Sequence, residues 1–245
     1  MNWLAIVAIG GTVGFLAGLF GAGGSAVGTP LLHAAGVPAF VAVASPLPCA
    51  IPVALAASGA YWGKGLIERR IITLASAFAV PATIAGALLT PLVGGLALVH
   101  ATEVIVVVIG LRLALFPMNP VRDAAQARGD RIRLAILATV IGLLSGLLAN
   151  SGGFLLTPLF LLGLHMPITR ALATSLAMSA LLAVPGTITH AALGHIDWLV
   201  VAAYGLPAIP TAHLGARVAL RSNPAWLGRA YGISLALLGT GLLAF

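Results

Sequence analysis

Small polar residues interrupt two apolar stretches of the chain, at residues 18–30 (GLFGAGGSAVGTP) and 146–158 (GLLANSGGFLLTP). A glycine cluster inside an apolar segment ends a helix, because glycine has no Cβ and high conformational freedom. In lipid, the backbone groups freed by such a break are tolerated only where they are buried in protein or line a cavity. Two helix breaks at corresponding positions of two repeats point to the binding site of a transporter.

The chemistry available at these breaks is anion binding. The first N–H groups of a helix carry about half a positive charge, so a helix N-terminus binds an anion without a cationic side chain. Hydroxyl and amide side chains beside the breaks add further donors. The residues predicted to contact the anion at the breaks are Gly23, Gly24, Ser25, Thr29, Asn150, Ser151, Gly152, Gly153 and Thr157. The alternative is close helix packing, for which small residues are the usual contact surface in membranes.

A second polar cluster lies early in the third apolar segment of each half, at residues 44–48 and 173–177. Prolines in the first of these stretches loosen a helix and free carbonyl groups. We therefore expect three hydroxyl residues to face the same cavity: Ser45, Thr174 and Ser175. Alternatively, these hydroxyls donate to the preceding helical turn, as is common in membrane helices.

Titratable residues are scarce at membrane depth. No Lys or Arg lies near the centre of an apolar segment, and no carboxylate pair is placed for proton or sodium coupling. His213, the most interior of the histidines, is a candidate for proton coupling, with a hydrogen-bonded structural role as the alternative. The chain has no HExxH, cysteine pair or Walker sequence, so we expect no metal, no cofactor and no catalytic residue. An intramembrane enzyme would need convergent acidic, His or Cys residues, which are almost lacking.

The composition is that of a membrane protein. Hydrophobic residues make up 60% of the 245 residues and charged residues only 7%, against about 25% charged residues in soluble domains. The apolar runs are long and uniform, which excludes the short alternating segments of a barrel. The sequence therefore predicts an all-α integral membrane protein. Its ten apolar segments cover roughly 3–20, 25–35, 39–60, 70–92, 98–116, 132–149, 152–164, 169–190, 197–220 and 225–245.

Eight of these segments approach the length of about 20 residues that a crossing requires, whereas the two that follow the breaks cover about half of it. The two halves are an internal duplication, because landmarks recur in the same order 128 or 129 positions apart. Gly24 corresponds to Gly152 and Gly65 to Gly194. We expect a first membrane repeat at residues 1–117, a linker at 118–131 and a second repeat at 132–245.

The distribution of basic residues distinguishes two topologies. If each short segment counts as a crossing, the repeats are inverted and all twelve Lys and Arg residues lie on one side. If it does not, the repeats are parallel and four of the twelve move to the opposite side. Basic residues near segment ends mark the cytoplasmic side. We therefore favour two inverted repeats of five segments, with cytoplasmic basic loops and both termini outside.

The glycine pattern from Gly14 to Pro30 and its copy from Gly142 to Pro158 carry a resemblance. Together with the Ala173–Ser175 element and the Gly194–Trp198 loop, they resemble the sulfite exporter TauE/SafE family of membrane permeases. The resemblance extends over nearly the whole chain. It implies a bacterial-type inner-membrane transporter, an exporter of sulfur-containing anions such as sulfite or an organosulfonate. The first repeat departs from the second in having Pro46 near the position of Ser175.

These observations together predict a secondary transporter, and not an enzyme, that alternates access around a midplane anion site. Its expected partners are a small anionic substrate and membrane lipid, with no nucleic acid. Transport of another small organic anion and a passive anion channel remain the alternatives. The sequence does not determine the oligomeric state.

Overall fold

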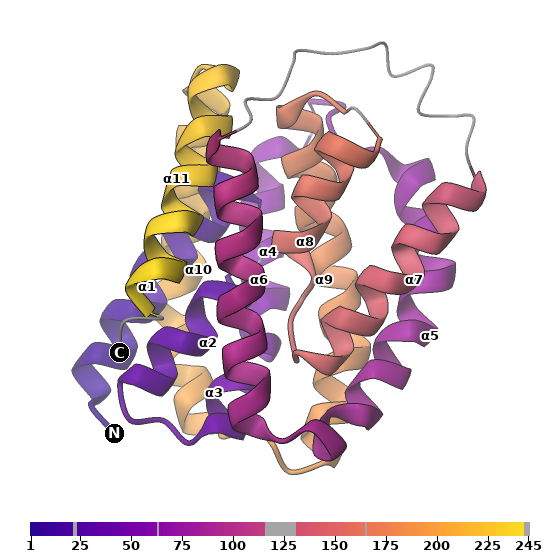
Figure 1. Ribbon diagram of the computed structural model, residues 1–245. Helices are drawn as coiled ribbons and strands as arrows, with labels where there is room; N and C mark the ends of the chain where they lie inside the picture. Colours follow the sequence, from indigo (N-terminus) through magenta and orange to yellow (C-terminus); the bar gives the residue numbers. More distant parts are fainter. Residues whose placement is uncertain (22–23, 63, 116–130, 165, 243–245) are drawn as a thin grey trace.

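The structure is a computed structural model of the chain and describes residues 1–245 except 22–23, 63, 116–130, 165 and 243–245. Every regular element in this part of the chain is a helix, and the helices form one bundle (Figure 1). The helices of the first half are α1 (Trp3–Phe20), α2 (Ser25–Ala34), α3 (Ala39–Ala44), α4 (Pro46–Tyr61), α5 (Arg69–Val93) and α6 (Gly95–Leu115). Those of the second half are α7 (Arg131–Leu147), α8 (Gly153–Pro158) with a π-helical turn (Leu159–Gly163), α9 (Ile168–Ala192), α10 (Trp198–Arg221) and α11 (Pro224–Leu242).

Six helices of the described residues are long and apolar enough to cross a membrane, with Ala39–Tyr61 counted as one of them. Large apolar side chains lie on the outside of the bundle, where Leu4 and Leu92 are more than four-fifths exposed (84% and 81%). In water such a surface would be unfavourable, but lipid is as apolar as these side chains. The chain is an integral membrane protein, as its composition predicts.

Glycines bring helices of the two halves into backbone contact. A Cβ built on Gly14 of α1 would lie 2.3 Å from the carbonyl oxygen of Ala208, and one on Gly142 of α7 would lie 2.3 Å from that of Ala79. Only a residue without a side chain permits such an approach. Along α1 the glycines 10, 14 and 18 face residues 204, 208 and 212 of α10, and along α7 the glycines 142 and 146 face residues 79 and 83 of α5.

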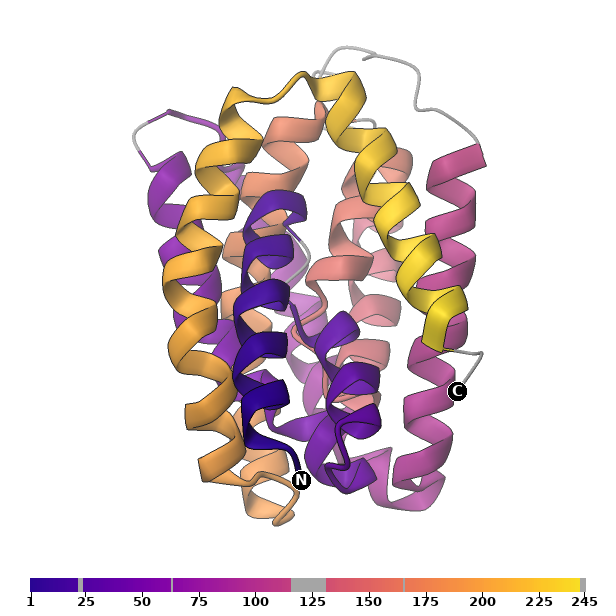
Figure 2. The same cartoon turned by 90° about the vertical axis from the view of Figure 1, so that its left-hand side faces the viewer.

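The two halves therefore interleave. Because the facing residue numbers rise together, α1 runs parallel to α10, and α7 runs parallel to α5. Each of these pairs joins a helix of the first half to one of the second. In contrast, α4 and α9 are antiparallel at the centre, since Gly186 late in α9 faces Leu47 early in α4. Figure 2 shows α1 and α10 side by side from the face that α1 occupies.

The bundle has two chemically different ends. We call the end where α6 stops and α7 begins the linker end, and the end where α1 begins and residues 193–197 connect α9 to α10 the terminus end (Figures 1 and 2). The linker itself lies outside the described residues apart from its last residue, Arg131. Ten of the twelve Lys and Arg positions are described, and all ten lie at or near the linker end.

Both predicted breaks are present. The first break (residues 21–24) separates α1 from α2, and the second break (residues 148–152) separates α7 from α8. Gly24 and Gly152 are the N-cap residues of the short helices, with φ of 77° and 74°. These are left-handed conformations that favour glycine. The first short helix, α2, returns toward the end at which α1 begins, since Asn2 N–H donates to the Ala35 carbonyl at 3.3 Å. In Figure 1, α8 likewise turns back toward the end at which α7 begins. The predicted half-length segments are confirmed.

Candidate functional site

The two breaks meet inside the bundle. Ser25 Oγ at the start of α2 donates a 2.7 Å hydrogen bond to Asn150 Oδ1 of the second break, although the residues are 125 positions apart. Ser151 N–H donates to Ser25 Oγ at 3.2 Å, and the two serine oxygens are 3.3 Å apart. All three side chains are buried, with at most 2% of their surface exposed. Three of the predicted donors, drawn from both halves, therefore form one cluster, which we call the break cluster (Ser25, Asn150, Ser151).

The Asn150 carboxamide has an unused donor. Gly152 N–H donates to Asn150 Oδ1 at 3.1 Å, and this contact identifies the oxygen because a backbone N–H cannot accept. The Oδ1 atom thus accepts two hydrogen bonds. The Nδ2 atom, in contrast, has no hydrogen-bond partner within the described part of the chain. A buried donor without a partner costs about 1–3 kcal/mol, so a bound acceptor would be stabilised here.

The end of α7 holds Asn150 in this position. Asn150 N–H donates to the Ser145 carbonyl at 2.7 Å, and Ser145 Oγ donates back to the Asn150 carbonyl. The preceding residue, Ala149, has φ of 44°, and its N–H donates to the Gly146 carbonyl at 3.1 Å. A left-handed alanine costs about 1–2 kcal/mol, so the surrounding contacts must enforce it. Ser145, which the sequence did not identify, thus positions the asparagine.

A second polar group ties the first break to the second half. Thr157 Oγ1 and Ser175 Oγ are 2.7 Å apart, and they lie 3.2 and 3.1 Å from the Gly21 carbonyl. Ser175 Oγ also lies 3.0 Å from the Leu172 carbonyl. The two hydroxyl protons therefore have sufficient acceptors without a ligand. Thr29, by contrast, donates to the Ser25 carbonyl of its own helix at 3.0 Å.

Ser45 and Thr174 lie apart from the break cluster and bind backbone at opposite ends. Ser45 Oγ accepts from Asp197 N–H at the terminus end, and Thr174 Oγ1 accepts from Glu68 N–H at the linker end, both at 3.1 Å. The two contacts are equivalent in the two repeats, because the offset of 129 relates Ser45 to Thr174 and Glu68 to Asp197. Glu68 additionally forms a 2.6 Å ion pair with Arg170. Direct substrate contact by Ser45 or Thr174 stays a prediction.

The remaining predicted site residues have simple placements. Gly153 is the first residue of α8, and Gly23 lies outside the described residues. His213 is half-buried on α10, with Nδ1 2.9 Å from the Ala56 carbonyl of α4. This contact matches the structural alternative for His213, and its role in proton coupling is untested.

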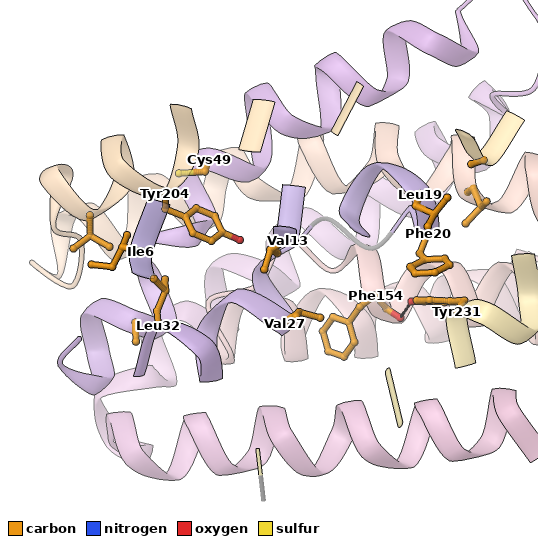
Figure 3. Close-up of a cluster of buried hydrophobic side chains, with 14 of the residues drawn as sticks. Ile6, Val13, Leu19, Phe20, Val27, Leu32, Cys49, Phe154, Tyr204 and Tyr231 are labelled. Atoms are coloured by element: carbon orange, nitrogen blue, oxygen red, sulfur yellow. Dashed lines mark hydrogen bonds between the residues drawn. The ribbon is translucent and has the colours of Figure 1, made fainter. Parts of the chain in front are cut away.

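Two tyrosines support the short helices and were missed from the sequence. Tyr204 Oη donates to the Gly24 carbonyl at 3.3 Å, and Tyr231 Oη donates to the Phe154 carbonyl at 3.2 Å. Figure 3 shows both rings in the buried apolar cluster, with Tyr231 stacked on Phe20 at 5.1 Å. A buried tyrosine usually finds a hydrogen-bond partner for its hydroxyl, although Tyr61 has none among the described residues. That tendency was the available signal, since the chain has only three tyrosines.

Comparison with known proteins agrees with this architecture. The family model described as "Sulfite exporter TauE/SafE" matches residues 6–242. A "Probable membrane transporter protein" of Xylella fastidiosa (strain 9a5c) is 26% identical over 243 residues, which are 94% of this chain and 90% of that protein. The "Probable membrane transporter protein YjnA" of Bacillus subtilis (strain 168) is 25% identical over 239 residues, covering 90% of this chain and 92% of that protein. No solved structure matches.

The family match extends over both breaks and all the described helices of the bundle. The break cluster, the buried polar contacts and the apolar exterior belong to one membrane-embedded unit. The chain is a multi-pass membrane transporter and belongs to the sulfite exporter TauE/SafE family.

Proposed function

We propose that this protein is a secondary transporter that exports a small sulfur-containing anion, such as sulfite or an organosulfonate. The observation that carries the proposal is the unused Asn150 Nδ2 donor, buried where the two breaks meet. The family description supports a sulfur oxyanion as the cargo. The anion would accept from Asn150 Nδ2 and, after rearrangement, from the hydroxyls of Ser25 and Ser151.

Neutral donors are suited to a carrier. The described Lys and Arg residues lie at or near the linker end, so no guanidinium or ammonium group among them belongs to the break cluster. Binding through hydroxyl, amide and helix N-terminal N–H groups is weaker than binding by a fixed cation. A transported anion must also dissociate on the far side, which weak binding favours.

The halves of the proposed transporter are inverted repeats. The reciprocal pairs α1–α10 and α7–α5 support this arrangement, as do the corresponding contacts of Ser45 and Thr174. The break cluster is closed to solvent in this conformation, with its side chains at most 2% exposed. Transport then requires movement of the repeats against each other, which opens the site to one face at a time.

The proposed orientation follows from the basic residues. Ten described Lys and Arg positions lie at or near the linker end, and basic residues near membrane segments mark the cytoplasmic side. The linker end would then be cytoplasmic in the inner membrane, and the terminus end would face outward.

The test is uptake of radiolabelled sulfite and methanesulfonate into proteoliposomes, with Asn150→Ala and Ser25→Ala compared with the wild-type protein. A hydrogen bond to a charged group contributes about 1.5–3 kcal/mol, so each substitution should weaken apparent affinity by about 10- to 100-fold. Thr139→Ala is the matched control, because this exposed hydroxyl donates only to Ala135 of its own helix. Unchanged transport by both site variants would place the anion elsewhere.

Counterflow separates a carrier from a passive channel, and the choice of substrate tests the other alternative, a different organic anion. Unlabelled substrate on the far side accelerates exchange through a carrier but leaves flux through a passive channel unaffected. If neither sulfite nor the sulfonate moves while another organic anion does, the cargo assignment is wrong and the carrier assignment stands.

A further inference from the structure

Two histidines form a hydrogen-bonded pair at the terminus end. His190, in the last turn of α9, is fully buried, and its Nδ1 lies 3.2 Å from Nδ1 of His195 in the loop that follows. Its Nε2 lies 3.1 Å from the Gly146 carbonyl of α7. The His195 ring is stacked on Phe40, with ring centres 4.7 Å apart. The pair therefore links α9, α7 and the loop between α9 and α10.

The contacts assign the protons of the neutral pair. A carbonyl only accepts, so His190 Nε2 carries a proton and donates to Gly146. His190 Nδ1 is then an acceptor, and His195 Nδ1–H must be the donor to it. The remaining basic nitrogen is His195 Nε2. An arriving proton would bind there and leave the pair with one positive charge and its internal hydrogen bond intact.

The pair acts on the backbone that positions the break cluster. The Gly146 carbonyl accepts from His190 Nε2 and also from Ala149 N–H, at 3.1 Å in both cases. Ala149 is the left-handed residue immediately before Asn150. A displacement of His190 would therefore disturb the turn that holds Asn150 against Ser25.

Among the described residues, no carboxylate forms a hydrogen bond or ion pair with either ring of the pair. Toward the terminus end of α4 and α6 and in the loop, the described titratable side chains are Cys49, His100, Glu103 and Asp197, whereas the described Lys and Arg residues of α7, α9 and α10 lie toward the linker end. The Asp197 carboxylate accepts from Leu199 and Val200 N–H, and Glu103 binds His100 at 3.0 Å. Cys49 is buried on α4. Burial lowers the pKa of His195, because the charged ring loses hydration in this closed conformation.

Among the described residues, such a histidine pair is found at the terminus end and has no counterpart at the linker end. The offset of 129 relates His190 and His195 to Tyr61 and Leu66 of the first half. Tyr61 is buried beside the linker end, where neither it nor Leu66 titrates near neutral pH. In the described part of the chain, the histidine pair therefore distinguishes the terminus end from the linker end.

We propose that His190 and His195 form a proton-binding site that favours opening of the transporter toward the terminus end. The inference rests on the alternating-access function proposed above. The closed conformation buries His190 fully and His195 in part, whereas opening toward this end would admit more water to both rings. A ligand shifts an equilibrium toward the conformation that binds it better. Protons at this face therefore drive the opening, and deprotonation favours the closed contact with Gly146.

The test measures access to the break cluster with a membrane-impermeant maleimide. Ser25→Cys in a Cys49→Ala background is labelled in right-side-out and inside-out vesicles at pH values of about 7.5 and about 5.5, which span histidine titration. Acid slows maleimide chemistry itself, so each rate is divided by the rate for His190→Gln/His195→Gln in the same background and at the same pH. Glutamine retains one donor and one acceptor at each position and does not titrate.

At the lower pH, the labelling rate from the terminus face, divided by that of the double glutamine variant, should rise. The rise is up to about tenfold for each unit by which the pKa of the histidine pair differs between the closed and open conformations. The ratio from the linker face should fall. His33→Gln is the matched control, because His33 is a partly buried histidine of the same end that contacts only the Val37 carbonyl, at 3.1 Å. This variant should keep the pH effect. A ratio that is independent of pH, or loss of the effect in His33→Gln, would overturn the proposal.

A second measurement uses the protein without a cysteine substitution. Because the pKa of His195 is depressed in the closed fold, thermal stability should decline as the pH falls below the ordinary histidine pKa. The decline is expected to be about 3–5 °C in Tm for each pKa unit of depression, and it should be absent from the double glutamine variant. Equal pH slopes in the two proteins would contradict a proton site at this pair.

The labelling and uptake experiments together separate the two proposals. Uptake into proteoliposomes is measured in protein that keeps Ser25, so it tests the anion site independently of the cysteine variant. Uptake that is insensitive to Asn150→Ala, with the pH effect on labelling intact, refutes the anion site and supports the proton site. Uptake that depends on Asn150, without a pH effect on labelling, refutes the proton site and supports the anion site.

Discussion

Replacement of Gly14 by alanine tests the interleaved packing of the two halves. The new Cβ would lie 2.3 Å from the Ala208 carbonyl oxygen and 2.5 Å from Ala208 Cα. The Thr211 hydroxyl oxygen would lie 2.6 Å away. Cβ atoms essentially never approach heavy atoms within 3.0 Å, so α1 and α10 must separate by roughly 0.7 Å to relieve the two backbone contacts. Overpacking of this kind costs about 1–3 kcal/mol.

Gly11→Ala on the same helix is the matched control. Its Cβ would meet only Pro207 Cβ at 3.8 Å, an ordinary contact. Both substitutions gain the helix propensity of alanine, about 1 kcal/mol, so this contribution cancels in their comparison. The difference between the variants is then the cost of the clash alone.

The assay is thermal unfolding of purified protein in detergent. Samples are heated to a series of temperatures, and size-exclusion chromatography measures the fraction of protein that stays monodisperse. A difference of about 2 kcal/mol corresponds to about 4–8 °C for a chain of this size. Gly142→Ala should behave like Gly14→Ala, because its Cβ would lie 2.3 Å from the Ala79 carbonyl oxygen. Equal melting temperatures for Gly14→Ala and Gly11→Ala would refute the parallel contact of α1 with α10.

Three further outcomes are expected from contacts away from this interface. Ser45→Ala and Thr174→Ala should each destabilise the protein by about 1 kcal/mol, since each leaves a backbone N–H without its acceptor; unchanged melting temperatures of both would show that water replaces the hydroxyls. The Glu68–Arg170 ion pair is partly exposed, so Glu68→Gln should cost less than about 1 kcal/mol, and raised salt should reduce the difference from the wild-type protein. Tyr204→Phe removes the donor to the carbonyl of the first break; it should cost about 1 kcal/mol and speed hydrogen exchange of residues 24–28, whereas exchange confined to the ends of α10 would contradict this role.

Much of the helical layout could be predicted because the bilayer and the glycines impose it. A crossing needs about 20 apolar residues, and a glycine cluster ends a helix, so the boundaries at Phe20 and Ser25 follow from local sequence. Small residues were interpreted either as helix breaks or as helix-packing contacts, and each interpretation holds for a different set of glycines. Gly14 and Gly142 are packing contacts, whereas Gly24 and Gly152 cap the short helices.

The contacts of the site were less predictable, because they join residues far apart in the chain. The sequence indicated Ser25 and Asn150 as donors, but the bond between them depends on how the halves pack. Ser45 was predicted to face the same cavity as Ser175 because both lie early in a helix, and only the fold shows that its hydroxyl accepts from the backbone N–H of Asp197. The pair of His190 and His195 was overlooked for a related reason, since histidines at segment ends are common and only the fold brings Gly146 to them.

The pairing of α1 with α10 also constrains how the protein is made. Gly14 leaves the ribosome 194 residues before Ala208, its contact on α10. At synthesis rates of about 5–20 residues per second, α1 waits roughly 10–40 s for its partner. During this interval its glycine face must be covered by lipid, by the insertion machinery or by another helix. Biogenesis of the first half therefore ends in a metastable intermediate, and a ribosome stalled in the linker would expose a protein that quality-control proteases can recognise.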